Sequence, residues 1–371
     1  MERHFRVLDA RVCLAGPEPV VSPIVTAYRR FLAPEDPAET PVRVRIHDGD
    51  DGKIEADTRV VPLEPGWDPT FQLYQQFLTT VLENIGSCAV LHAAALVDRS
   101  GEGFLIAAPA GHGKSSLTLE LVSRGYALLS DDYAPVDLAT GTLHPYPRAV
   151  AVLADGDAPI PEVFRSAARD PSVARLFSKS LLDVGDLLGE ERLASNPVPL
   201  RRVILLGSPA TGDPAEGFTW LQVGALRERA DTIEAGLSGI DGVEVLERVD
   251  GTHLCFWKLR IRHDRSPTAA LTRLVDGEGA LFYEKCWATR PDFTGAPSRR
   301  RAGRREAALL LGRELMNRGV GSRFLARHPG GTTEILFDLA GALRETGCWR
   351  VSVGRFEETA DLIETILREP A

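Results

Sequence analysis

The segment from Gly101 to Gly125 constrains the fold of this chain more than any other. It begins with the apolar run GEGFLIAA, continues through the glycine-containing stretch APAGHGKS and ends with SLTLELVSRG, whose spacing and final glycine are typical of a helix. A strand that passes through a tight loop into a helix is a building unit of α/β sheets. The neighbouring strand patterns CAVLHAAALV and YALLS predict an α/β fold built around this unit.

The stretch Ala108–Ser115 fits the pattern GxxxxGK[ST], with alanine in place of the first glycine. Small residues allow backbone N–H groups to turn inward around phosphate oxygens, and the N-terminus of the following helix adds positive partial charge. Lys114 would then reach the β- and γ-phosphates of a nucleotide, and Ser115 would hold Mg²⁺. The alternative is an ordinary strand–helix turn with an exposed lysine. We expect ATP and Mg²⁺ as cofactors, bound by Ala108, Pro109, Ala110, Gly111, His112, Gly113, Lys114, Ser115 and Ser116.

Two adjacent carboxylates, Asp131 and Asp132, follow the strand pattern YALLS. Because this strand comes directly after the phosphate-loop helix, it can lie near the loop in the sheet. One carboxylate there can bind Mg²⁺, and the other can accept the proton of an attacking hydroxyl. A metal ion would also relieve the repulsion between the two charges. The alternative is a loop start with two solvated aspartates, but the position after a phosphate loop favours a site.

Strand and helix patterns divide the chain into four parts. Residues 1–66 form a β-rich N-terminal unit, because stretches such as PVRVRIHDG alternate apolar and polar residues. Residues 67–210 form the phosphate-loop core, with an irregular stretch at 154–200. Residues 211–330 are an elaboration of unknown role, which contains the basic loop SRRRAGRRE and a helix through AALLLGRELMNRG. Residues 331–371 supply a terminal strand and helix that return to the core.

Composition narrows the classes of partner. The formal net charge of −9 argues against nucleic acid, because phosphate contacts need clustered lysine and arginine. No apolar run approaches the roughly 18 residues of a membrane helix, and MERHFRVLDARVCLAG lacks the apolar core of a signal peptide. Five cysteines without a CxxC pair suit free thiols and argue against a zinc site. We therefore expect a soluble, cytoplasmic protein without nucleic-acid or membrane partners.

Residues 91–136, LHAAALVDRSGEGFLIAAPAGHGKSSLTLELVSRGYALLSDDYAPV, resemble the central segment of HPr kinase/phosphorylase. The resemblance implies the catalytic fold that this family shares with ATP-dependent phosphoenolpyruvate carboxykinase. It also implies that Asp131 is the catalytic base, that Asp132 is a carboxylate on the Mg²⁺ side, and that His92 lies near the transferred phosphate. The alternative for His92 is a histidine satisfied within the core.

The sequence departs from that family at two places. Ser116 stands where the family has a glutamate, and a second, glycine-rich signature used against HPr is not evident. HPYPRAV instead resembles a PFPR element of HPr-kinase-like proteins encoded beside peptide-modifying genes, some of which phosphorylate serine in precursor peptides, including those of lasso peptides. This likeness implies that Arg148 clamps a phosphate, with Lys179 as a further candidate. The alternative for Arg148 is a surface arginine after a turn.

These features predict an ATP- and Mg²⁺-dependent kinase that phosphorylates serine or threonine in a peptide or protein. The alternatives are a kinase of a small-molecule alcohol, a carboxykinase-like lyase, and a nucleotide-binding scaffold or regulatory protein without chemistry. The expected partners are a nucleotide and the acceptor, and the sequence leaves open whether the chain forms a homo-oligomer. The basic cluster Ser298–Glu306 would either capture an acidic acceptor or form a solvated loop.

Overall fold

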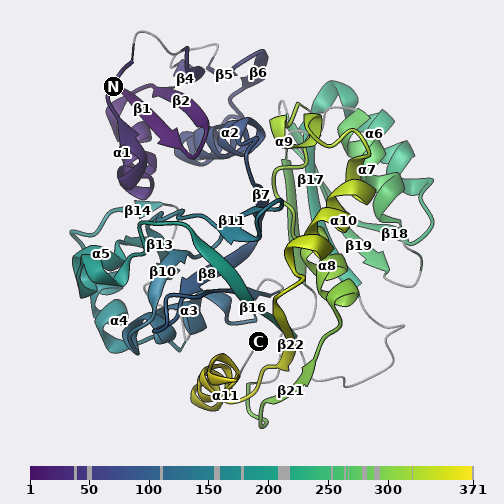
Figure 1. Cartoon of the computed structure of the whole chain (residues 1–371). Coiled ribbons are helices and arrows are strands. Elements are labelled where there is room, and N and C mark those ends of the chain that lie inside the picture. Colours follow the sequence, from purple (N-terminus) through teal and green to yellow (C-terminus); the bar gives the residue numbers. More distant parts are fainter. Residues whose placement is uncertain are drawn as a thin grey trace.

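The computed structural model describes residues 1–36, 40–47, 52–108, 112–153, 159–176, 179–207, 218–251, 254–262, 265, 267–277, 282–287, 293–319 and 321–369. Within these ranges the chain forms β-sheets of six, nine, three and four strands, with helices packed against them (Figure 1). The fold is α/β, and the nine-stranded sheet carries the strand that leads into the phosphate loop.

The N-terminal unit contains a six-stranded sheet and α1 (Glu18–Ala27). Helix α2 (Pro69–Asn84), which lies beyond residue 66, packs against one face of this sheet beside α1. Alternation explains its strands, since Phe5 and Val7 are buried while Arg6 between them is exposed. In the order of the sheet, the strands are β3 (Leu32–Ala33), β1 (Glu2–Val7), β2 (Ala10–Ala15), β4 (Val42–His47), β5 (Lys53–Ala56) and β6 (Arg59–Pro62).

The nine-stranded central sheet is built around three neighbouring parallel strands, β9 (Gly103–Ala107), β16 (Val198–Gly207) and β22 (Gly347–Ser352). These strands are mostly buried, as expected where both faces are covered. One face packs against α3 (Lys114–Ser123) and α11 (Phe356–Arg368), and the other against α8 (Arg304–Arg313) and α10 (Gly331–Ala342). The remaining strands are β7 (Ala89–Leu91), β8 (Ala93–Val97), β10 (Ala127–Ser130), β11 (Ala134–Asp137), β12 (Thr142–Leu143) and β21 (Ser298–Arg301).

A small sheet, in the order β13 (Val150–Leu153), β15 (Lys179–Leu182) and β14 (Arg175–Leu176), follows in the chain. With α4 (Glu162–Arg169) and α5 (Val184–Leu188), it gives regular structure to much of a stretch expected to be irregular. That expectation is wrong for these elements, because the prolines that suggest irregularity, such as Pro161 and Pro171, flank α4 and do not interrupt it.

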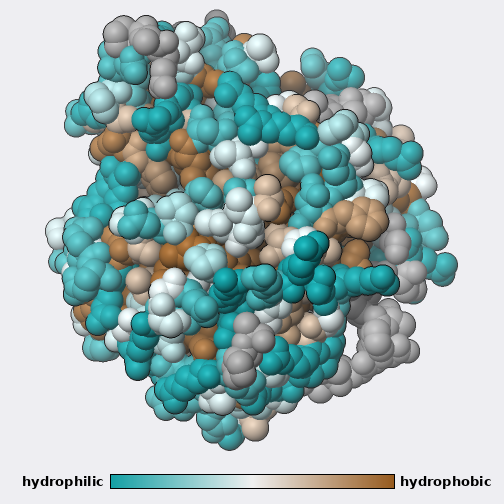
Figure 2. Space-filling model, viewed as in Figure 1, coloured by the Kyte–Doolittle hydropathy of each residue, from teal (hydrophilic) through white to brown (hydrophobic). Residues whose placement is uncertain are grey.

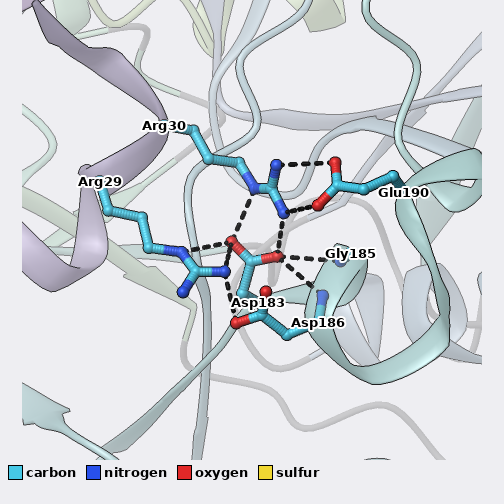
Figure 3. A network of polar contacts seen from close by, with 6 residues as sticks. All are labelled: Arg29, Arg30, Asp183, Gly185, Asp186 and Glu190. Atoms are coloured by element: carbon cyan, nitrogen blue, oxygen red, sulfur yellow. Dashed lines mark hydrogen bonds and ion pairs between the residues drawn. The ribbon is translucent and has the colours of Figure 1, made fainter.

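A charged network joins this region to the N-terminal unit (Figure 3). The Asp183 carboxylate caps α5 by accepting hydrogen bonds from the Gly185 and Asp186 N–H groups. It also accepts from both Arg29 and Arg30, and its side chain is only 8% exposed. Arg30 donates to Asp183 from two nitrogens, a bidentate geometry that fixes the orientation of both groups. The network therefore holds the turn after α1 against the start of α5.

Residues 218–287 contain a separate antiparallel sheet in the order β18-β19-β17-β20. Two helices separate its strands in a β-α-β-β-α-β succession, which is the split β-α-β arrangement. Trp257, Ile233 and Leu271 belong to its own hydrophobic core. Phe256 stacks on Trp67 with 4.7 Å between ring centroids, which connects the unit to the start of α2. Its elements are β17 (Phe218–Leu226), α6 (Ala230–Ser238), β18 (Val243–Asp250), β19 (Leu254–Arg262), α7 (Thr268–Gly277) and β20 (Phe282–Trp287).

The segment between this unit and α10 differs from expectation at two points. Ser298–Arg301 is not a loop but forms β21, because β22 offers a strand edge and the Trp349 ring on which two of the arginines stack. The helix expected through AALLLGRELMNRG ends at Arg313, since the backbone of Glu314–Met316 bonds to residues of the β7 region instead. The short helix α9 (Arg323–Ala326) follows.

The face seen in Figure 2 is mostly hydrophilic, with hydrophobic residues visible where the N-terminal unit meets the central region. One hydrophobic cluster crosses this junction and contains Phe5, Tyr28 and Phe77 from the N-terminal side and Tyr133 and Tyr146 from the central side. Aromatic side chains bury large areas at such a contact. The N-terminal unit is thus packed onto the part of the central sheet that follows the paired aspartates.

Candidate functional site

The phosphate loop connects β9 to α3. Ala108 is buried directly after the strand, and His112 is buried on the other side of the loop. The predicted ligands Pro109, Ala110 and Gly111 lie outside the described residues. Gly113 precedes α3 with a φ of +80°, a left-handed conformation that favours glycine, and the Phe293 ring lies 3.6 Å from where a Cβ would stand. Lys114 begins the helix and is 7% exposed.

The structure brings the start of α3 and the paired aspartates together. Lys114 Nζ donates to the backbone oxygen of Asp131 over 3.1 Å and is ion-paired with the Asp132 carboxylate. Ser115 Oγ donates to Asp131 Oδ2 over 3.1 Å. Asp131 and Asp132 follow β10, which pairs with β8, the neighbour of β9. The order of strands in the sheet therefore places both carboxylates at the end of the strands where α3 begins.

The two carboxylates have different electrostatic surroundings. Asp131 is 6% exposed, and its burial, together with the charge of Asp132, raises its pKa. Burial also disfavours ionisation of Asp132, but Lys114 and Arg148 outweigh it and hold the pKa of Asp132 below its usual value. For Lys114, burial opposes the charged form, but Asp132 and Asp131 outweigh it and raise the pKa of the ammonium. The cluster therefore keeps one carboxylate firmly ionised and the other more basic.

One buried oxygen in this cluster, Asp131 Oδ1, has no hydrogen-bond partner among the described residues. A buried acceptor without a partner is costly, and either a nearby cation or the proton of an approaching hydroxyl would satisfy it. The Ser115 hydroxyl and the Asp132 carboxylate add oxygen atoms of the type that Mg²⁺ prefers. The donor set at the start of α3 thus fits a hard divalent cation.

Arg148 lies beside the paired aspartates with a side chain that is 9% exposed. It donates from Nη2 to Asp132 Oδ2 over 3.1 Å and from Nη1 to the hydroxyl of Tyr74 over 2.5 Å. Its guanidinium carbon lies 4.9 Å from the centre of the Tyr133 ring, within cation–π range. The buried position differs from that of a surface arginine after a turn, and two cations, Arg148 and Lys114, face one carboxylate.

His92 lies at the bend between β7 and β8, and its side chain is 29% exposed. Its Nε2 is 3.9 Å from Asp132 Oδ1. Its other ring nitrogen, Nδ1, is 3.3 Å from Glu314 Oε2. The histidine therefore lies between the carboxylates of Asp132 and Glu314 at the edge of the cluster, unlike a histidine enclosed in an apolar core.

The structure does not bring every candidate into this cluster. Lys179 is exposed at the start of β15, and its described contacts include none with the phosphate-loop residues or the paired aspartates. Ser116 is buried in the first turn of α3. In the basic cluster, Arg299 pairs with Glu369, and Arg300 pairs with Glu306. Both arginines thus form ion pairs with carboxylates of this chain, which argues against their binding an acidic acceptor at β21.

Three residues next to the cluster are missed by sequence reasoning. Tyr74 is one of several apolar or aromatic residues on the buried side of α2, so its pattern predicts a core position. Phe293 lies in a loop rich in proline and glycine, and no motif marks it. Glu314 follows α8, and its separation of 222 residues from His92 leaves no local pattern that could pair the two. Only the three-dimensional arrangement identifies these residues.

Comparison with known proteins gives local matches. No protein-family model matches the chain. The chain is 48% identical over 48 residues to HPr kinase/phosphorylase of Clostridium botulinum (strain Eklund 17B / Type B). These 48 residues cover 13% of this chain and 16% of that protein. The matched segment of this chain is HPr-kinase-like. HPr kinase/phosphorylase of Limosilactobacillus reuteri (strain DSM 20016) is 42% identical over 65 residues, which cover 18% of this chain and 20% of the relative.

The chain thus matches between about one sixth and one fifth of the length of these curated relatives. The solved structure of the Hpr(Ser) kinase/phosphatase from Coxiella burnetii is 25% identical, with a TM-score of 0.24, and its match covers 34% of this chain and 73% of that chain. Among the helices that the structure describes, none combines the length and apolar character needed to cross a membrane.

Proposed function

We propose that this chain is a kinase that uses ATP and Mg²⁺ to phosphorylate a hydroxyl group. The observation that carries the proposal is the contact between the start of α3 and the paired aspartates. Lys114 and Ser115 bond directly to Asp131 and Asp132. This cluster combines groups suited to hold a triphosphate with groups suited to serve a metal ion and to accept a proton. The local similarity to HPr kinase/phosphorylase supports the same activity.

Each group in the cluster has a role in this proposal. Lys114 and the loop backbone hold the β- and γ-phosphates of ATP. Ser115 and Asp132 hold Mg²⁺, which when bound neutralises charge on the phosphates. Asp131 accepts the proton of the attacking hydroxyl, because its Oδ1 has no partner among the described residues and its pKa is raised by burial, whereas Lys114 and Arg148 engage the carboxylate of Asp132. Arg148 orients a phosphate oxygen through its planar fork of N–H donors.

The acceptor in this proposal is serine or threonine of a peptide or protein. Two observations support it. HPYPRAV, which contains Arg148, resembles the PFPR element of HPr-kinase-like proteins encoded beside peptide-modifying genes, and Arg148 contacts Asp132 in the structure. The relatives from Clostridium botulinum and Limosilactobacillus reuteri are also, by name, kinases of HPr. A ribosomal peptide precursor is the acceptor that the resemblance favours. In the same proposal, residues 67–210 and 331–371 form the catalytic core.

The test is incubation of the purified protein with γ-labelled ATP, Mg²⁺ and the peptides and proteins encoded by neighbouring genes. We expect label on a serine or threonine of one of them, and none with the Lys114→Ala protein. Label on a small-molecule alcohol and on no peptide would overturn the acceptor class. Tight ATP binding without transfer to any hydroxyl would overturn the kinase and would indicate a nucleotide-binding protein without chemistry.

A further inference from the structure

Glu314 contacts His92 twice, although it lies outside the phosphate loop and the paired aspartates. The His92 N–H donates to the backbone oxygen of Glu314 over 2.7 Å. The side chains meet as well, with His92 Nδ1 3.3 Å from Glu314 Oε2. The Glu314 side chain is 14% exposed, so the contact is largely shielded from water. A partly shielded bond of this kind restricts the rotation of the imidazole ring.

The backbone around Glu314 is fixed independently of its carboxylate. Met316 N–H donates to the Val90 oxygen over 2.8 Å, and the Val90 N–H donates to Asn317 Oδ1 over 2.9 Å. Asn317 is 1% exposed, and its amide nitrogen donates to the backbone oxygens of Ile85 and Cys88. Residues 314–317 therefore run alongside residues 90–92 like a short antiparallel strand. A change in the Glu314 side chain leaves these bonds in place.

The chemistry of the two side chains decides which nitrogen of His92 faces the site. A carboxylate can accept a hydrogen bond but has no proton to donate. The Nδ1–Oε2 contact is therefore a hydrogen bond only when Nδ1 carries a proton, whether the ring is neutral or charged. The other nitrogen, Nε2, is then the edge that the ring presents toward Asp132, 3.9 Å away. A second partner that selects the tautomer and orientation of a functional histidine is a recurring device.

We propose that Glu314 is a positioning residue that orients His92 and so presents Nε2 to the site of the transferred phosphate, an inference that rests on the proposed kinase function. Glu314 acts through His92 and touches neither nucleotide nor acceptor. It lies within residues 211–330, the part of the chain to which the sequence alone assigns no role. In this proposal, a residue near the end of that part fixes the orientation of a side chain beside the phosphate loop.

The kinetic test compares Glu314→Leu with Glu314→Gln. The leucine side chain cannot accept from Nδ1, so kcat should fall by about 10- to 100-fold, the usual cost of losing an orienting partner, with KM for ATP nearly unchanged. The glutamine carbonyl can still accept, so Glu314→Gln should restore most of the turnover. Glu345→Leu, at an exposed surface position, is the matched control. In the His92→Asn background, Glu314→Leu should lower kcat no further, because its effect passes through His92. An equal loss in both backgrounds would overturn the proposal.

A second measurement does not depend on activity. The ¹⁵N shifts of the His92 ring, assigned with the His92→Asn protein, report which nitrogen carries the proton. The wild-type ring should have a protonated Nδ1, and Glu314→Leu should move the proton toward Nε2. Unchanged shifts in Glu314→Leu would overturn the positioning role. A further outcome is that the wild type transfers phosphate to no acceptor while the His92 shifts change as expected in Glu314→Leu. That result would overturn the kinase proposal and would still support the role of Glu314 in orienting His92.

Discussion

Arg148 Nη2 lies 3.1 Å from Asp132 Oδ2, and the same carboxylate is paired with Lys114 on its other oxygen. Two buried cations thus share one carboxylate. Burying unpaired cations would be costly, so Asp132 stabilises both positive charges in their buried positions. In the proposed function, the phosphates of ATP meet two cations that are already oriented.

The Arg148–Asp132 relationship predicts the effect of Arg148→Lys. A lysine ammonium cannot match the planar fork that reaches the Tyr74 hydroxyl and the Asp132 carboxylate together. Losing one charge-assisted hydrogen bond costs about 1.5–3 kcal/mol, so phosphoryl transfer should fall by roughly 10- to 100-fold. Initial rates with saturating ATP would measure it. Arg201→Lys, at an exposed ion pair with Glu345, is the control, and equal rates for both variants would contradict a role for the fork.

Lys114→Ala should weaken ATP binding strongly, because it removes the cation that faces the β- and γ-phosphates. The same change leaves the buried Asp131 and the partly buried Asp132 without their nearest ammonium, so the melting temperature of the nucleotide-free protein should also fall. Calorimetric titration with ATP and Mg²⁺ measures the first effect and thermal unfolding the second. An unchanged ATP affinity would exclude the phosphate-loop assignment. Lys53→Ala, on the N-terminal sheet, should change neither quantity.

Asp131→Asn should keep ATP binding and lose most phosphoryl transfer. Asparagine has a similar shape but cannot take the proton of the attacking hydroxyl, and loss of a general base usually costs roughly 10²–10⁴-fold. Asp132→Asn is the informative companion, because it should weaken the metal-dependent binding of ATP as well. If Asp131→Asn transfers phosphate within a few-fold of the wild type, the base is a different residue, and Asp132 is the next to test.

The Asp183 network predicts a pH dependence of stability. Burial alone would raise the pKa of Asp183, but Arg30 and Arg29 outweigh it and lower that pKa below its ordinary value. The unfolded chain, with an Asp pKa near 3.9, therefore takes up the proton more readily. The stabilisation is fully present above about pH 4 to 5 and is lost as the pH falls through the folded pKa.

Urea unfolding at a series of pH values between about 6 and 3 tests this expectation. The free energy of unfolding of Asp183→Asn should be lower than that of the wild type near neutral pH and should change less on acidification, because asparagine still caps α5 but carries no charge. Asp68→Asn, at the exposed cap of α2, is the matched control and should follow the wild type. Parallel curves for the wild type and Asp183→Asn would contradict the prediction.

The phosphate loop and the paired aspartates could be predicted to be neighbours because they are close in sequence. The strand patterns around them place Lys114 and Asp132 at adjacent ends of one sheet, and the structure shows the ion pair. Glu314 could not be predicted to join them, since helical spacing continues through AALLLGRELMNRG and favours a longer helix. Bonds from distant residues 90–92 end α8 at Arg313, and long-range pairing of this kind has no local signature.

The β-α-β-β-α-β unit leaves and rejoins the central sheet at nearly the same place. Gly207 at the end of β16 stands opposite Ser352 of β22, and Ser298 at the start of β21 stands opposite the same residue. The points of departure and return are thus two strand spacings apart, about 10 Å. A few residues could close that gap. The intervening unit is therefore inserted between two nearby points of the central sheet, and β16, β22 and β21 remain neighbours on either side of the insertion.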